Sequence, residues 1–242
     1  MDWERGSRFR SEPTPFGDVA SRHKVLPGSV SRVSLRRMDR LIVARHAESE
    51  YNVKGLIDAE PSSRRSPLTD RGRDQARSLA DRLEGDDVDL CVTSGTLRAV
   101  QTGQVVANSL SIPLLKTPLL DDPPAGIFEG GPVDAFATWM REHDPDTPVP
   151  GTSATLRASA RRYLDAAWFL LDRPERTVLV VAHAPALRWI VQAALGRTDS
   201  LDYSSPLFAY ADPAEVDVRA LRSRLYTLVS DPFDVLSGRA DD

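Results

Sequence analysis

Cysteine is almost absent from this sequence: Cys91 is the only one among 242 residues. A single cysteine cannot form an intrachain disulfide, which is typical of a reducing compartment. Long apolar runs are missing too, since none approaches the roughly 18 residues of a membrane-spanning helix. The N-terminus also lacks the apolar stretch of a secretory signal. We therefore expect a cytoplasmic protein without a membrane partner.

A strong excess of charge of one sign is also absent. The 31 Lys and Arg residues against 35 Asp and Glu residues give a net charge of −4. This balance provides no general attraction to nucleic acid, so we expect no nucleic-acid partner. The few His and Cys residues show no spacing typical of metal ligands, and we expect neither a metal nor another cofactor.

Residues 1–37 differ in composition from the rest of the chain. They are rich in Ser, Arg and Pro and show no sustained helical or strand period. We interpret them as a disordered or non-native N-terminal extension, with Met38 as an alternative start directly before the first expected strand. A single domain is then expected over 38–230, with a cap segment at about 130–160 and a tail over 231–242.

From residue 40 onward, short apolar runs alternate with amphipathic helical patterns. The expected strands span 41–44, 88–93, 112–115 and 177–182, and the expected helices span 69–83, 95–109, 132–141, 153–171 and 185–195. An edge strand is expected at 207–210, and 214–229 fits either a helix or a hairpin. Such alternation predicts an α/β fold with three layers, in which helices cover both faces of a mostly parallel sheet.

Two of the expected strands end directly in a histidine. The run at 41–44 leads into Arg45 and His46, and the run at 177–182 leads into His183. A third segment, which contains Arg98, follows the strand at 88–93. Because open α/β sheets bind ligands at the carboxyl ends of their strands, we expect these segments to meet in one crevice.

The residue types in this crevice suit a phosphate monoester. Arg45 and Arg98 supply planar forks that can each grip two phosphate oxygens. The backbone amide of Ala184 opens a helix, whose N-terminus attracts anions. An imidazole can accept a phosphoryl group, and we assign that role to His46, with His183 as a second donor to the transition state. The leaving alcohol then needs a carboxylic acid near the pocket mouth.

The octapeptide RHAESEYN at 45–52 resembles the signature of the histidine phosphatase (phosphoglycerate mutase-like) superfamily. The resemblance continues through PLTDRGRDQA at 67–76, resumes at Ser94 and at RAVQT at 98–102, and ends at VVAHA at 180–184. It implies a phosphoglycerate mutase-like fold with a small helical cap insertion. It also implies that His46 becomes phosphorylated, that Arg45, Arg98 and His183 complete the phosphate pocket, and that Asn52 contacts the phosphate.

Three carboxyl residues are candidates for the general acid. The family usually carries a Glu ahead of a Gly-rich element, and the position that matches by counting back from Gly126 is Asp122. Asp121 and Glu129 remain alternatives for this role.

Three further departures from the family pattern concern small or missing side chains. Ala47 and Ala184 replace the glycines that usually follow the two histidines. Alanine is the smallest replacement with a Cβ, so the backbone can still approach a phosphate. The turn at 150–153 lacks a Glu that many relatives carry, which predicts different substrate contacts there.

These observations favour a metal-independent phosphomonoesterase that works through phosphohistidine. A small phosphorylated metabolite is the expected substrate, with a phosphoprotein as the alternative. The short interval between Asp122 and His183 resembles the compact phosphatases more than the mutases, although mutase-type phosphoryl transfer remains the second hypothesis. A catalytically weak phosphate-binding module is the third.

Overall fold

The computed structural model describes residues 38–63, 65–196 and 208–226. These residues all belong to one unit that spans residues 35–242. The expectations for 1–37 and for the tail at 231–242 therefore lie outside the described residues. No helix within the described ranges is long and apolar enough to cross a membrane.

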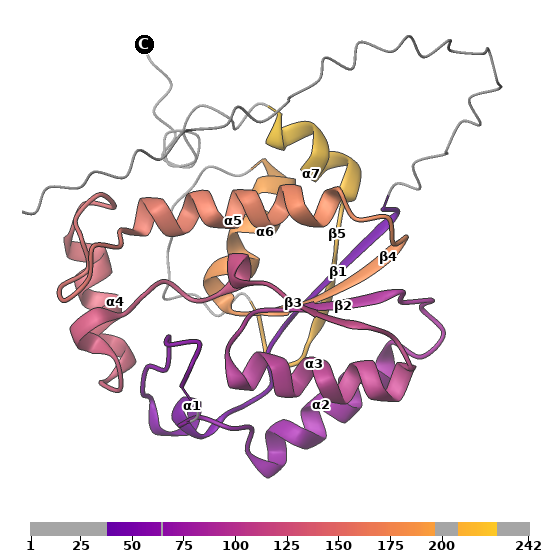
Figure 1. Ribbon diagram of the computed structural model, residues 1–242, viewed down its shortest axis with the longest axis horizontal. Coiled ribbons are helices and arrows are strands. Elements are labelled where there is room, and N and C mark those ends of the chain that lie inside the picture. The colour runs from indigo at the N-terminus through magenta and orange to yellow at the C-terminus, as the bar shows by residue number, and fades with distance from the viewer. Residues whose placement is uncertain (1–37, 64, 197–207, 227–242) are drawn as a thin grey trace, which may run out of the picture. The chain divides into compact units, whose positions relative to one another are not determined.

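Five strands form one sheet at the centre of this unit (Figure 1). They are β1 (Arg40–Arg45), β2 (Leu90–Thr93), β3 (Leu114–Lys116), β4 (Thr177–Ala182) and β5 (Pro213–Val216). Their order is β3-β2-β4-β1-β5, and only β5 runs antiparallel to its neighbour. The prediction of a mostly parallel sheet is confirmed.

Helices cover both faces of the sheet, which confirms the three-layer α/β/α architecture. Figure 1 shows α2 and α3 on one face and α5 and α6 on the other. The helices of the described residues are α1 (Glu50–Lys54), α2 (Asp70–Arg82), α3 (Leu97–Leu110), α4 (Val133–Glu142), α5 (Leu156–Leu171), α6 (Ala184–Leu195) and α7 (Val218–Leu225). Two 3₁₀ turns, Pro118–Leu120 and Gly126–Phe128, lie between β3 and α4.

The side chains of β1 divide between two hydrophobic clusters. Leu41 and Val43 belong to the cluster that includes α5 and α6. Ile42 and Ala44 belong to the cluster that includes α2 and α3. Successive strand residues point to opposite faces, so an all-apolar strand fits only a sheet that is covered on both sides. Because both faces of β1 are buried, the direction of this strand is fixed, and so is the place at which the residues after it leave the sheet.

The loop after β1 is fastened to the start of α2. Thr69 caps this helix: its hydroxyl accepts from the Gly72 amide at 2.9 Å and donates to a Glu48 carboxylate oxygen at 2.8 Å. A Cβ on Gly72 would lie only 2.0 Å from the Glu48 carbonyl oxygen. Glycine at this position therefore lets α2 pack directly against the loop that carries His46.

Near the carboxyl end of the described chain the structure differs from the sequence prediction. The edge strand is β5 at Pro213–Val216, whereas the prediction placed it at 207–210. Within that earlier segment, Tyr210 makes a single bridge to Arg45, and residue 207 lies outside the described residues. Only Val216 of β5 is buried, so the strand lacks an apolar run that would identify it. For 214–229 the sequence left open a helix or a hairpin. Up to residue 226, the structure has the end of β5 followed by helix α7.

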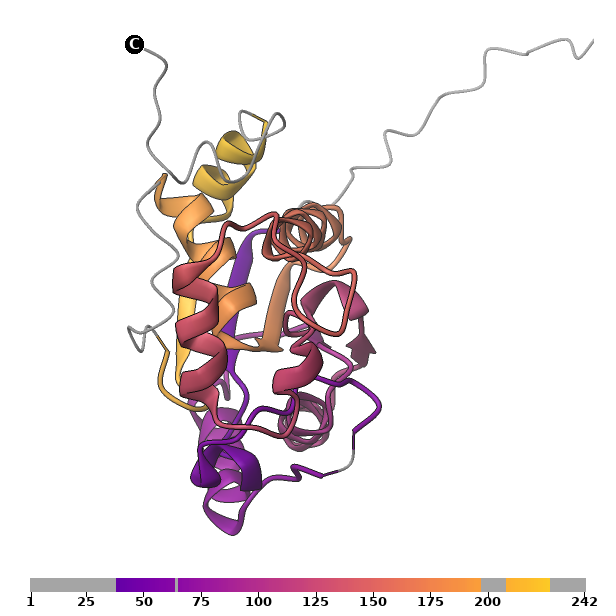
Figure 2. The same cartoon turned by 90° about the vertical axis from the view of Figure 1, so that its left-hand side faces the viewer.

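Helix α4 lies within the segment predicted as a cap. In Figure 2 it lies on the near side of the sheet, above α1, a helix that the sequence analysis did not predict. Its Phe136 and Trp139 pack in a small separate cluster with Ile57 and Val149. The Val133 amide donates to the carbonyl of Gly55 at 2.9 Å, which joins α4 to the loop after α1.

Candidate active site

The three predicted segments meet at the carboxyl ends of β1, β2 and β4. His46 follows β1, His183 follows β4, and Arg98 lies in the first turn of α3 after β2. All three side chains are buried, with exposed fractions of 2%, 1% and 5%. They line a cavity of about 310 Å³. The sheet order places β4 between β1 and β2, which is why these side chains reach one another.

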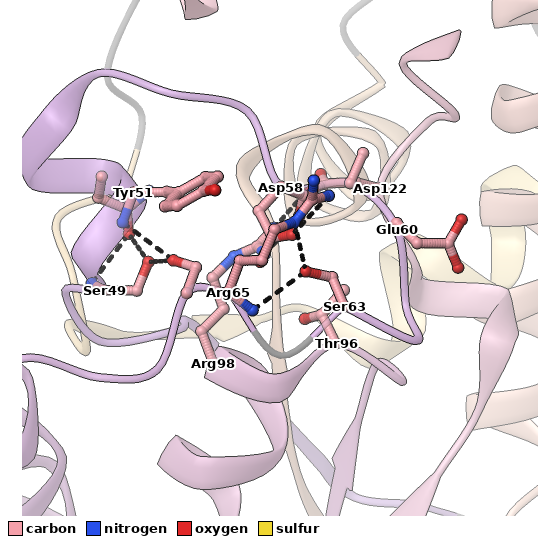
Figure 3. Close-up of polar contacts among 12 residues, drawn as sticks. Ser49, Tyr51, Asp58, Glu60, Ser63, Arg65, Thr96, Arg98 and Asp122 are labelled. Atoms are coloured by element: carbon pink, nitrogen blue, oxygen red, sulfur yellow. Dashed lines mark hydrogen bonds and ion pairs between the residues drawn. The ribbon is translucent and has the colours of Figure 1, made fainter. Parts of the chain in front are cut away.

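The guanidinium of Arg98 links the two histidines to a carboxyl group. Its Nε donates to His46 Nε2 at 3.0 Å, and its Nη2 lies 3.1 Å from His183 Nδ1. Nη2 also donates to Asp122 Oδ2 at 2.6 Å, while Nη1 donates to the Asp58 carbonyl at 2.6 Å. Figure 3 shows Arg98 with Asp58 and Asp122 close by. Arg98 therefore fixes the geometry of the whole site.

His46 is held as a neutral imidazole with a free electron pair on Nε2. Its Nδ1 lies 2.8 Å from the Ala47 carbonyl, which can only accept, so Nδ1 carries the proton. Burial lowers the pKa of His46 well below its usual range, and the charges of Arg98 and Arg45 lower it further. This ring therefore has the protonation state that a nucleophile requires.

His183 is oriented from both sides of its ring. Its Nε2 lies 2.8 Å from Ser94 Oγ and 3.2 Å from Thr96 Oγ1. Because Arg98 can only donate, Nδ1 accepts its N–H and Nε2 carries the proton in this state. Burial first, and then the charge of Arg98, lower the pKa of His183 well below the usual range. A bound dianion has the opposite effect and favours the imidazolium.

Asp122 is the predicted acid that lines the cavity. Its carboxyl is 18% exposed and lies 3.1 Å from His183 Nδ1. Burial raises the pKa of Asp122 above its usual range, against the opposing charges of Arg98 and Arg45. A raised pKa keeps a carboxyl protonated at higher pH, which is the property that a general acid needs.

The other two candidate acids are engaged elsewhere. Asp121 Oδ1 accepts from the Gly95 amide at 2.6 Å. Glu129 accepts from the Ala59 amide at 3.0 Å and forms an ion pair with Arg65 at 2.7 Å. Burial raises the pKa of both carboxyls, but neither lines the cavity that contains the two histidines.

Arg45 faces the cavity with an unsatisfied donor. Its Nε is buried and has no hydrogen-bond partner among the described residues. A buried donor without a partner costs free energy, and a bound anion would satisfy it. The Arg45 guanidinium lies 4.2 Å above the ring of Tyr210, whose hydroxyl accepts from Nη2 at 3.4 Å. Tyr210 therefore positions Arg45 by a cation–π contact.

Asn52 and Ala184, the remaining predicted residues, also line the cavity. The Asn52 amide oxygen accepts from the Ser49 amide and hydroxyl at 3.1 and 2.8 Å, so its NH₂ group is the end able to donate to a ligand. Helix α6 begins at Ala184, with His183 as its N-cap. Ala184, the first residue of this helix, lines the cavity, and an amide at a helix N-terminus suits an anion.

Several charged or aromatic residues of this site were not predicted from the sequence, among them Tyr210, Asp58 and Arg188. Asp58 and Arg188 are buried and line the cavity. Arg188 lies in α6 shortly after His183, and a helical-wheel inspection of that segment would have placed it near the site. No sequence signal marks Asp58 or Tyr210, because tertiary contacts alone bring them to Arg98 and Arg45.

The contact between Tyr210 and Arg45 predicts a difference between two variants. We expect Tyr210→Leu to weaken binding of orthovanadate by about 2- to 30-fold, because a cation–π contact contributes roughly 0.5–2 kcal/mol. Tyr210→Phe keeps the ring and should lose less. Isothermal titration calorimetry measures both, and equal losses in the two variants would contradict a role for the ring.

The sequence profile of the histidine phosphatase superfamily (branch 1) matches residues 41–219. A 2,3-bisphosphoglycerate-dependent phosphoglycerate mutase from Brucella ovis is 33% identical over 174 residues, which cover 65% of this chain and 82% of the relative. The corresponding mutase of Methylobacterium sp. (strain 4-46) is 33% identical over 177 residues, or 66% and 83% of the two chains.

Solved structures of two bacterial proteins share the fold. YhfR of Bacillus stearothermophilus has a TM-score of 0.62 at 26% identity, covering 74% of this chain and 91% of YhfR. The alpha-ribazole phosphatase of Shigella flexneri has a TM-score of 0.60 at 24% identity, covering 74% of this chain and 90% of the phosphatase. With its matching motifs, its sheet order and its paired histidines, this chain belongs to the histidine phosphatase superfamily.

Proposed function

We propose that this protein is a metal-independent phosphomonoesterase that forms a phosphohistidine on His46. The observation that carries the proposal is the neutral, buried imidazole of His46, whose Nε2 receives the Arg98 Nε–H at 3.0 Å in the cavity. Arg45, with its unsatisfied Nε, supplies a second cation to the same cavity. A small phosphorylated metabolite remains the expected substrate.

The first step transfers the phosphoryl group to His46. The phosphate oxygens attract the Arg98 guanidinium, which frees the electron pair on Nε2. That nitrogen attacks phosphorus as the ester P–O bond breaks on the opposite side. The leaving alcohol oxygen takes the proton of Asp122, while Arg45, Arg98 and a protonated His183 stabilise the charge on the equatorial oxygens.

The second step returns the enzyme to its starting state. The Asp122 carboxylate accepts a proton from water as the water oxygen attacks phosphorus. The N–P bond breaks, and its electron pair returns to His46 Nε2. Inorganic phosphate leaves, and Asp122 is again protonated for the next cycle.

Phosphoglycerate mutase activity is the second candidate, because the two mutase relatives are 33% identical to this chain. A mutase would convert 3-phosphoglycerate into 2-phosphoglycerate when 2,3-bisphosphoglycerate is supplied. A phosphatase would instead release inorganic phosphate. A binding module would bind vanadate and turn over neither compound.

Removal of the nucleophile tests the proposal directly. We expect His46→Ala to reduce hydrolysis of p-nitrophenyl phosphate, measured with EDTA present, to the background rate. His143→Ala is the matched control, because this ring stacks on Trp139 outside the cavity and its loss should leave the rate near that of the wild type. Wild-type activity in His46→Ala would rule out the assigned nucleophile.

The pKa shifts in the site predict a pH dependence. Because the pKa of Asp122 is raised, the rate of alkyl phosphate hydrolysis falls only when the pH rises through the pKa of Asp122 and this acid loses its proton. The lowered pKa of His46 means that the imidazole stays unprotonated, and the rate persists, well below pH 6.5.

Asp122→Asn should lower hydrolysis of alkyl phosphates by about 10²–10⁴-fold and remove the decline at high pH. The effect should be smaller for p-nitrophenyl phosphate, because its leaving group needs little protonation. Steady-state rates over a range of pH values measure both effects. An unchanged rate in Asp122→Asn would transfer the acid role to Asp121 or Glu129.

A further inference from the structure

We infer that the cavity accepts phosphomonoesters whose alcohol portion is apolar, an alkyl or aryl group, in preference to polyhydroxylated or carboxylated alcohols. This inference rests on the proposed function and specifies its substrate class. Neither the family match nor the names of the relatives indicate such a preference.

The cavity has two chemically different ends. The phosphate end holds the two histidines, Arg98 and Asp122, which are joined by the hydrogen bonds described above. The opposite wall comes from α4 and from the loop after α1. It consists of Leu56, Ile57, Val133, Phe136, Ala137 and Met140. The described residues with which α4 lines the cavity carry neither a charge nor a hydrogen-bonding side chain.

This apolar wall is built as a firm surface. Phe136 is buried and packs against Phe128 and Trp139, with ring centroids 5.3 and 6.1 Å apart. The N-terminal end of α4 is joined to the loop after α1 through the amide of Val133. The wall therefore has a fixed shape before any substrate enters, which favours a ligand of complementary surface.

The size of the cavity indicates that a sizeable group accompanies the phosphate. About 310 Å³ lies at the lower end of the range for pockets that enclose small organic ligands. Val133 lines this cavity while 46% exposed, so part of the apolar wall faces water when no ligand covers it. An alkyl or aryl group would remove that surface from water, which is favourable.

Hydrophilic alcohols gain nothing from the same wall. Hydroxyl groups placed against Phe136, Ala137 and Met140 would lose their hydrogen bonds to water without replacement, which is costly. A carboxylate such as that of phosphoglycerate would lose still more. The charged lining residues are Arg45, Arg98, Arg188, Asp58 and Asp122, and none of them comes from α4. Asp58 and Asp122 contact Arg98, and Arg188 lies on α6, the helix that begins directly after His183.

The test compares two primary alkyl phosphates, so that the bond broken is the same. We expect kcat/KM for hexyl phosphate to exceed that for glycerol 3-phosphate by about tenfold or more, the scale on which an apolar pocket discriminates. Equal values, or a preference for glycerol 3-phosphate, would overturn the inference while leaving the proposed phosphatase activity intact.

Two alanines of α4 provide matched variants. Ala137 lines the cavity, whereas Ala135, two residues earlier, is exposed and lies outside it. We expect Ala137→Asp to lower kcat/KM for hexyl phosphate by about tenfold and to change that for glycerol 3-phosphate little, while Ala135→Asp changes neither. If Ala137→Asp folds poorly, Met140→Gln serves as the second variant, because it nearly conserves the side-chain volume. We expect it to lower kcat/KM for hexyl phosphate as well. The inference would be contradicted if Ala135→Asp lost the preference for hexyl phosphate over glycerol 3-phosphate. It would also be contradicted if Ala137→Asp and Met140→Gln both kept that preference.

A binding measurement separates this inference from the proposed function. Calorimetry on His46→Ala compares the affinities of hexyl phosphate and glycerol 3-phosphate without turnover. Tighter binding of hexyl phosphate supports an apolar subsite even if the wild type hydrolyses no ester, in which case only the phosphatase proposal fails. Equal affinities overturn the subsite whatever the activity.

Discussion

The buried guanidinium of Arg98 is the constraint on which the site depends. A charge removed from water must find partners, and those of Arg98 are His46, His183, Asp122 and the Asp58 carbonyl. These contacts bring together four chain segments that are far apart in sequence. The same charge helps to lower the pKa of both histidines, which keeps His46 neutral, as its proposed role requires.

The order of the strands places Arg98 where it can contact both histidines. With β4 between β1 and β2, the carboxyl ends of three parallel strands lie at one edge of the sheet. Burial of β1 and β4 on both faces fixes the direction of each strand and thus the exit of each histidine. The close approach of Gly72 to the Glu48 carbonyl then holds the loop after His46 against α2.

Much of this arrangement could be predicted from the sequence, because it depends on local signals. Apolar runs that end in His46 and His183 identified two strands and the edge at which the site lies. Thr69 caps the beginning of α2 and Gly196 the end of α6, and both residue types are typical of these helix positions. Features that depend on tertiary contacts were missed or misplaced. Tyr210 reaches the site through its bridge to Arg45, and β5 has only one buried residue.

The choice of Asp121 or Asp122 as the candidate general acid also depends on tertiary contacts. Neighbouring residues of one type cannot be distinguished by composition or by counting along a motif. In the structure, Arg162 and Tyr163 of α5 donate to the Asp121 carbonyl, and the Gly95 amide donates to its carboxylate. These contacts turn Asp121 away and leave Asp122 beside Arg98. The outcome depends on α5, about 40 residues further along the chain.

In the proposed mechanism, His46 carries the phosphoryl group between substrate and water. Quenching wild-type turnover of p-nitrophenyl phosphate in alkali and mapping the modified peptide by mass spectrometry would detect this intermediate, since phosphohistidine is stable to base and labile to acid. We expect a phosphoryl group on His46 that disappears on acid treatment. A phosphoryl group on another residue, or rapid turnover with none detected on His46, would contradict this mechanism.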